Sequence, residues 1–142
     1  MKHLVAMVFI YLLVATVYAQ LVPIEIVNNA EDLNGKALVT MFRDLIRRSE
    51  AYELTYAKNE AHFVVHINTM DRYKGDSASE GISTIYNYMI LLNTGDGTQI
   101  YCYNQLGYVG KDVLSDVAYQ IYTDLDEFVE SFKSYMSNYS GE

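Results

Sequence analysis

Residues 82–110, ISTIYNYMILLNTGDGTQIYCYNQLGYVG, decide the fold of this chain. The two halves of this stretch are rich in β-branched and aromatic side chains, which favour long strands. Gly95-Asp96-Gly97 lies between them and is a strong hairpin signal, because glycine adopts the positive φ angles that tight turns need. The stretch therefore predicts a β-hairpin with strands over about 82–93 and 98–109.

The residues around this hairpin predict two helices and three more strands. Apolar residues recur at helical spacing over about 35–48 and over 112–137, which predicts two amphipathic helices. Alternating apolar residues predict short strands over 23–27 and 52–56 and a longer strand over 61–70. Pro23 suits an edge strand, because proline has no backbone N–H to donate. The order β-α-β-β-β-β-α predicts an α+β fold, a two-layer sandwich in which a mostly antiparallel sheet carries both helices on one face.

The first 19 residues have the layout of a cleavable secretory signal. A short charged head precedes an apolar run over residues 4–17, and Ala19 supplies the small residue at the cleavage point. The run is about 14 residues long, shorter than the roughly 20 that cross a bilayer. We therefore predict a signal peptide over 1–19, a single domain over 20–142, and export to the periplasm or the medium. A retained N-terminal anchor is the alternative.

Charge and cysteine content narrow the partners and the compartment. Without the first 19 residues, the remaining 123 carry 9 basic and 18 acidic side chains, a net charge of −9. This charge repels phosphate backbones and anionic lipids, so we expect neither nucleic-acid nor membrane binding. Cys102 is the single cysteine, so no internal disulfide forms. An exported domain without disulfides fits a bacterial periplasm better than an animal secretory pathway.

One stretch of the chain resembles a known type of domain. A helix followed by Glu60-Ala61-His62-Phe63-Val64-Val65, then two long strands joined around Asn93–Gly97 and a last helix, resembles small bacterial envelope modules. These are the N-terminal domain of the translocation protein TolB and the penicillin-binding-protein activator lipoproteins. The likeness covers most of residues 35–135 and concerns element order and an Ala-x-x-Val-Val strand start. It implies a non-catalytic adaptor of the cell envelope and assigns no site residues.

The hairpin also predicts a candidate binding surface, because side chains alternate between the two faces of a strand. With Met89 opposite Cys102 and Leu91 opposite Ile100 on the core side, the reverse face is aromatic. If the strand over 61–70 lies beside it, this open face carries Tyr86, Tyr88, Tyr101, Tyr103 and His66. Tyrosine is enriched at protein interfaces, so we predict that this face binds another protein or a second copy of the chain.

Two other interpretations of the tyrosines remain open. Cross-strand tyrosine pairs stabilise a half-exposed sheet without any partner. Residues 20–30 or 71–81 would also remove the surface by covering it.

The last helix offers a second candidate surface. Its outer face carries a run of carboxylates: Asp116, Asp124, Asp126, Glu127 and Glu130. Because this acidic face would attract an oppositely charged partner, it would suit a periplasmic immunity or inhibitor protein that binds a toxin. The simplest interpretation is a solvated helix face.

No motif indicates catalysis, a metal or a cofactor. His62 and His66 would lie about 13 Å apart on a strand, at ~3.3 Å per residue, which excludes joint chelation. There is no Gly-x-Ser-x-Gly elbow, and we expect Cys102 to be a small buried core residue. We therefore predict a non-catalytic protein that acts through protein contacts in the bacterial envelope. A small hydrolase that pairs His66 with a serine is the enzyme alternative.

Overall fold

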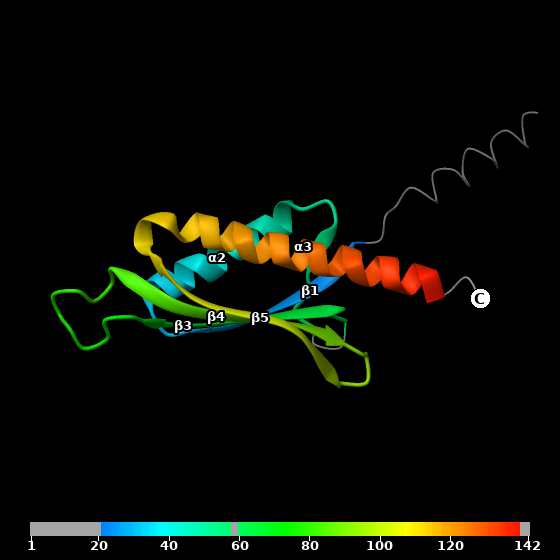
Figure 1. Ribbon diagram of the computed structural model, residues 1–142, viewed down its shortest axis with the longest axis horizontal. Helices are drawn as coiled ribbons and strands as arrows, with labels where there is room; N and C mark the ends of the chain where they lie inside the picture. Colours follow the sequence, from blue (N-terminus) through cyan, green and yellow to red (C-terminus); the bar gives the residue numbers. More distant parts are fainter. Residues whose placement is uncertain (1–20, 58–59, 140–142) are drawn as a thin grey trace, which may run out of the picture.

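The computed structural model describes residues 21–57 and 60–139, which form a five-stranded sheet with two long helices on one side (Figure 1). In chain order the elements are β1 (Val22–Ala30), α2 (Leu33–Arg48), β2 (Tyr52–Leu54), β3 (Phe63–Asp71), β4 (Ser83–Asn93), β5 (Gln99–Gly110), the 3₁₀ turn η1 (Lys111–Val113) and α3 (Leu114–Tyr139). The predicted α+β class and order of elements are confirmed. The predicted signal peptide lies outside the described residues.

The sheet is mixed, with the order β2-β1-β3-β4-β5. β1 runs parallel to β2 and to β3, whereas β3, β4 and β5 form an antiparallel meander. β1 therefore lies inside the sheet, and the edge position expected for its proline is wrong. Pro23 is accommodated at the beginning of the ladder, where its carbonyl accepts a hydrogen bond from the His62 N–H at 2.9 Å.

The two helices cover the face of the sheet that β3 presents through its first apolar residues. Phe63, Val65 and Ile67 are buried on this face, as predicted. α3 packs a stripe of buried residues against it: Leu114, Ala118, Ile121, Leu125 and Val129. The Phe63 ring meets the rings of Phe128 and Phe132 edge-on, at centroid distances of 5.7 Å each. Neither helix in the described part of the chain is long and apolar enough to cross a membrane.

The face of β4 that meets the helices is the opposite of the one predicted. Directly paired residues share a face, and Ile67 pairs with Tyr88 while Val65 pairs with Ile90. Tyr88 is 0% exposed and Tyr86 is 7% exposed, so both belong to the core. The expectation that they line an open face is wrong. Met89, which was expected in the core, lies on the face without helices.

A bulge in the hairpin separates the remaining tyrosines. The register shifts between Ile90 and Leu91, so that Leu91 pairs with Tyr101 while Ile90 pairs with Tyr103. One extra residue in β5, Cys102, changes which face the following side chains occupy. Tyr101 therefore lies on the open face and Tyr103 on the helix side. Cys102 is half-buried rather than fully buried, and its thiol donates to the Ile100 carbonyl at 3.2 Å.

Candidate functional site

Residues from the two predicted surfaces meet in one hydrogen-bonded cluster between β4, β5 and α3. The Tyr88 hydroxyl donates to the carboxylate of Asp124, which also accepts from the Gln120 amide at 2.6 Å. The Tyr103 hydroxyl donates to the Gln105 amide oxygen at 2.9 Å, and that oxygen lies 3.0 Å from the Tyr88 hydroxyl. We call these five residues the tyrosine–aspartate cluster. It joins the edge of the sheet to the middle of α3.

This cluster anchors α3 rather than forming an open binding face. Burial, together with the hydrogen bond to Asp124, raises the pKa of Tyr88 well above its ordinary value, so the phenol keeps its proton and stays a donor. A similar bond lies on the other flank of the helix, where Tyr52 donates to Asp126 at 2.5 Å. Burial is also the main cause that raises the pKa of Tyr52. Two tyrosines of the sheet thus hold α3 from both sides.

The acidic face predicted for α3 is divided by these contacts. Asp124 and Asp126 are half-buried and bonded to tyrosines, so the expectation that they are solvated is wrong. Asp116, Glu127 and Glu130 are exposed, as a solvated helix face requires. Periodicity alone placed all five on the outside, because it does not reveal that the sheet offers phenol hydroxyls to carboxylates on the helix flanks.

Tyr86 has a structural role of its own. It pairs with Gly107 across the β4–β5 ladder, and its ring covers the glycine backbone. A Cβ at Gly107 would lie 2.6 Å from the Tyr86 hydroxyl oxygen and 2.7 Å from its ring carbon. Tyr86 also stacks on Tyr88, with ring centroids 6.3 Å apart. The side chain therefore fills the space that the missing Cβ leaves, and it is not available to a partner.

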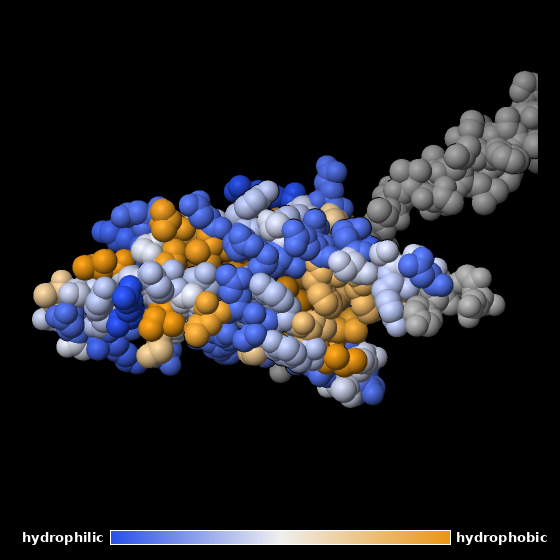
Figure 2. All heavy atoms as spheres, viewed as in Figure 1, coloured by the Kyte–Doolittle hydropathy of each residue, from blue (hydrophilic) through white to orange (hydrophobic). Residues whose placement is uncertain are grey.

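The open face of the sheet carries a different exposed set. Leu106 and Tyr108 of β5 are each 69% exposed, and Tyr101 and Met70 are also exposed. We call these four residues the β5 surface. Figure 2 shows hydrophobic residues that reach the surface on the sheet side of the molecule among hydrophilic ones. The Arg72 guanidinium lies over the Tyr108 ring, 4.6 Å from its centroid, and covers part of one ring face.

β5 is also an edge strand of unusual composition. Its twelve residues, QIYCYNQLGYVG, include no charged residue and no proline, and most of them are exposed. Among the described residues it has a neighbouring strand on one side, β4. The other edge strand, β2, is three residues long. Natural proteins usually protect edges by making them short, charged or interrupted by proline, and β5 has a bulge as its one such feature.

A polar row crosses the open face beside the β5 surface. Asn29, Asn68 and Asn87 are register neighbours on β1, β3 and β4. Asn29 donates to the Asn68 side-chain oxygen at 2.9 Å, and Asn87 donates to the Gln105 carbonyl at 3.2 Å. The three asparagines border a shallow hollow of about 300 Å³. Sequence reasoning missed this row, since it becomes visible only with the register of the three strands.

His66 lies on the open face, as predicted, between Val27 and Met89 of the adjacent strands. Its Nε2 is buried and has no hydrogen-bond partner among residues 21–57 and 60–139, so it is not paired with a serine of this part of the chain. Burial lowers the pKa of His66, and the nearby Glu25 carboxylate partly opposes that effect. His62 precedes β3 and is exposed.

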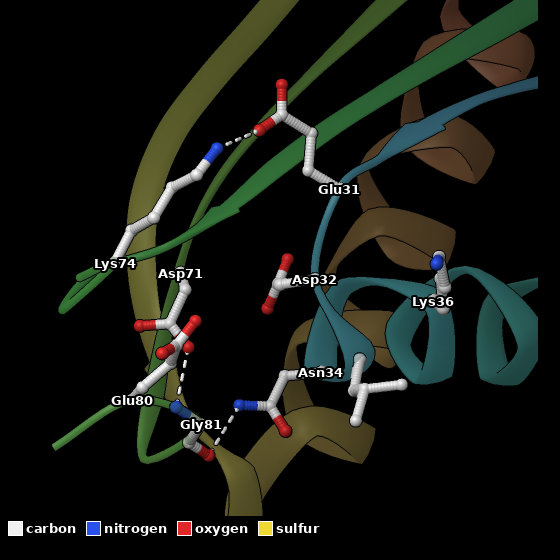
Figure 3. Close-up of a pocket in the computed structure, with 9 residues that line it drawn as sticks. Glu31, Asp32, Asn34, Lys36, Asp71, Lys74, Glu80 and Gly81 are labelled. Carbon is white, nitrogen blue, oxygen red and sulfur yellow. Dashed lines mark hydrogen bonds and ion pairs between the residues drawn. The ribbon is translucent and has the colours of Figure 1, made fainter. Parts of the chain in front are cut away.

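A polar cleft of about 400 Å³ lies where β1 and β3 end and α2 begins (Figure 3). Asp32, the N-cap of α2, accepts from the Gly35 N–H at 3.3 Å and from the Thr69 hydroxyl at 2.6 Å. Asp71 accepts from the Gly81 N–H at 2.6 Å. Figure 3 shows that an ion pair between Lys74 and Glu31, at 3.0 Å, closes one end.

The cleft's hydrogen bonds are internal to the fold. Asn34 donates to the Gly81 carbonyl at 3.0 Å, and Asp71 also accepts from the Tyr73 N–H at 2.7 Å. These bonds hold the loop after β3 against the beginning of α2. Across residues 21–57 and 60–139, no group of three or more histidine, cysteine, aspartate or glutamate side chains is placed to hold a metal ion. The cleft was not predicted, because its walls come from three separate segments.

Comparisons with known proteins do not assign this chain to a family. No protein-family model matches it, and no curated protein matches it. Among solved structures, the chain is similar to a PelC dodecamer from Paraburkholderia phytofirmans, with 13% sequence identity and a TM-score of 0.45. That match covers 70% of this chain and 81% of the PelC chain. The resemblance to TolB-type envelope modules stays a prediction.

Proposed function

We propose that this chain is an exported, non-catalytic module of the bacterial cell envelope that binds another protein along β5. The observation that carries the proposal is the combination of a long, uncharged edge strand with exposed apolar side chains beside it. A free edge presents unpaired backbone N–H and C=O groups, and proteins recognise such edges by adding a strand to them. The export part of the proposal rests on the signal pattern in residues 1–19.

The side chains of the β5 surface give such a contact its energy. Burying a large apolar side chain completely contributes roughly 1.5–3 kcal/mol. Leu106 and Tyr108 keep most of their area in water, so a partner strand has apolar area to cover. Tyrosine is also among the residues that most often dominate the binding energy of interfaces. The free edge of β5 therefore supplies backbone groups, and the open face beside it supplies anchoring side chains.

Site-specific photocrosslinking in the native host tests this proposal. A benzophenone side chain replaces Leu106 or Tyr108 in two separate variants, and Met41 in a control variant. Met41 is also an exposed apolar residue, but it lies on α2. We expect the same protein adduct from both β5 positions and none from the control position. Adducts that are equal at all three positions, or absent at both β5 positions, would overturn the proposal.

A further inference from the structure

The outer edge of β5 has backbone groups that point away from the sheet. The Lys111 N–H donates to the Ile82 carbonyl at 3.2 Å, which continues the register in which Ser83 pairs with Gly110. In an antiparallel ladder, alternate residues direct their N–H and C=O groups to the same neighbouring strand. The odd-numbered residues of 103–109 therefore bond to β4. Among the described residues no strand lies on the other side, where the outward N–H and C=O groups belong to Asn104, Leu106, Tyr108 and Gly110.

These outward-facing residues are arranged symmetrically about Gly107. Leu106 and Tyr108 lie on either side of it, and each is 69% exposed. If an antiparallel copy of β5 places Gly107 opposite Gly107, Leu106 of each copy lies opposite Tyr108 of the other. This register uses all four outward-facing residues in hydrogen-bonded pairs. A register shifted in either direction loses at least one of these pairs, because the β4–β5 ladder is regular only over 103–110.

The side chains at this register fit each other. Directly opposed side chains of an antiparallel pair share a face, with Cβ atoms about 4.5–5.5 Å apart. Leu106 and Tyr108 would therefore shield each other from water on the open face, twice in the pair. Arg72 covers part of one face of the Tyr108 ring, and most of that side chain stays exposed. Gly107 has no side chain, so the two backbones can approach closely at the centre.

The charges near β5 allow the strand to pair with its own copy. Like charges directly opposite each other oppose strand pairing, and β5 carries no charged residue. On α3, the exposed Asp116 and Glu127 lie opposite the buried stripe at 100° per residue, so they point away from the sheet. Asp124 is turned toward β4, where it is half-buried and bonded to Tyr88 and Gln120. β5 therefore has no charge that would select a foreign partner and none that would exclude its own copy.

We infer that the molecule that adds a strand to β5 is a second copy of this chain, paired antiparallel over Asn104–Gly110 about a two-fold axis at Gly107. The axis is perpendicular to the sheet, so the two sheets join into one and both helix layers lie on the same side. Such a contact is closed, because each β5 edge is used by the other copy. This inference rests on the proposed function and identifies its partner.

Sedimentation velocity over a range of concentrations tests the inference on the protein purified from its native host. We expect a reversible monomer–dimer equilibrium, and Leu106→Asp should raise its dissociation constant at least tenfold. Leu33→Asp is the matched control, because Leu33 is 83% exposed and lies at the beginning of α2, where a carboxylate is tolerated. It should leave the equilibrium unchanged. Circular dichroism verifies the fold of both variants.

A mixture of two variants tests the register. Leu106→Asp and Tyr108→Lys should each associate weakly alone. When one chain of each kind forms a pair, the new carboxylate lies opposite the new ammonium group, and the second Leu106–Tyr108 contact is intact. We expect the mixture to have a dissociation constant at least threefold lower than either variant alone, in line with the modest strength of exposed ion pairs. Leu106→Asp mixed with Asn104→Lys is the control and should show no such gain, because Asn104 would lie opposite Gly110.

The outcomes separate this inference from the proposed function. Crosslinks from positions 106 and 108 that join two copies of the chain would support both. A purified protein that stays monomeric, while the same crosslinks join it to a different protein, would overturn the inference alone. A dimer that Leu106→Asp leaves intact, or a mixture with Tyr108→Lys that gains nothing over its control, would also overturn the inference alone if crosslinks from β5 persist. Absence of crosslinks at both positions would overturn both proposals.

Discussion

The hydroxyl of Tyr88 donates a hydrogen bond to the carboxylate of Asp124, which joins β4, the strand beside the β5 edge, to the middle of α3. Tyr88 is completely buried, and a buried hydroxyl without a partner is strongly unfavourable. The carboxylate satisfies this hydroxyl, and Gln120 satisfies the carboxylate in turn. A tyrosine that appeared suited to a binding surface is thus a core residue, because a helix supplies its acceptor.

Removing this hydroxyl should destabilise the protein. We expect Tyr88→Phe to lower the free energy of unfolding by about 1.5–3 kcal/mol, since hydrogen bonds to charged groups contribute about that much. Tyr103→Phe is the matched control, because Tyr103 is 37% exposed and its acceptor is a neutral amide. We expect it to cost clearly less. Urea unfolding followed by circular dichroism measures both, and equal losses would contradict the anchoring role of Asp124.

The two tyrosine anchors of α3 should act independently. Tyr52 lies on β2 and Tyr88 on β4, three strand spacings apart in the sheet. At about 4.8 Å per spacing this is roughly 14 Å, beyond the range at which substitutions usually couple. We expect the effects of Tyr52→Phe and Tyr88→Phe on the free energy of unfolding to add within about 0.5 kcal/mol. A larger deviation in the double variant would show that the two substitutions are coupled through α3.

The order of the elements was predictable from the sequence because periodicity and turn residues are local properties. The face of β4 was not, since both of its faces are apolar enough for a core. One face carries Ile85, Met89 and Leu91, and the other carries Tyr86, Tyr88 and Ile90. Aliphatic residues suggested the first face. The structure buries the second face. Asp124 accepts the hydrogen bond of the Tyr88 hydroxyl, and Gly107 leaves room for the Tyr86 ring.

The candidate surface on β5 was only partly predictable for a similar reason. A strict hairpin register places Tyr101 and Tyr103 on one face, and the bulge at Cys102 separates them. A bulge depends on the packing of the whole ladder, and the residue pattern of the turn does not predict it. The acidic residues of α3 were recognised as a group. The positions of Tyr88 and Tyr52 were needed to see that Asp124 faces the β5 side and Asp126 faces the β2 side.

The close contact between Tyr86 and Gly107 predicts a position-specific effect of alanine. Gly107→Ala should lower the free energy of unfolding by about 1–3 kcal/mol, because the new methyl group would overlap the Tyr86 ring. Gly110→Ala is the matched control at the end of the same strand, where nothing lies within 4 Å of the added Cβ. It should be neutral or slightly stabilising, because alanine restricts the unfolded chain. Thermal unfolding of both variants tests this, and similar values would contradict the contact.

The burial of His66 predicts a stability that falls in mild acid. Burial lowers its pKa in the folded protein, so the unfolded chain takes up the proton at a higher pH than the folded chain does. Between the ordinary value near 6.5 and the lower folded value, the unfolded state binds more protons, and stability decreases as the pH falls. The contribution of neutral His66 is therefore complete above about pH 7 and is lost through this window. His66→Gln should show a flatter dependence on pH between 8 and 5.

Two further variants test whether His66 is the group responsible. Glu25→Gln removes the carboxylate that opposes the lowered pKa, so the loss of stability in acid should become larger. His62→Gln removes an exposed histidine four residues away and is the control for a general effect of losing an imidazole. Urea unfolding midpoints at pH 8, 6.5 and 5 give the comparison. If His66→Gln and the wild type lose stability in parallel over this range, another group controls the acid response.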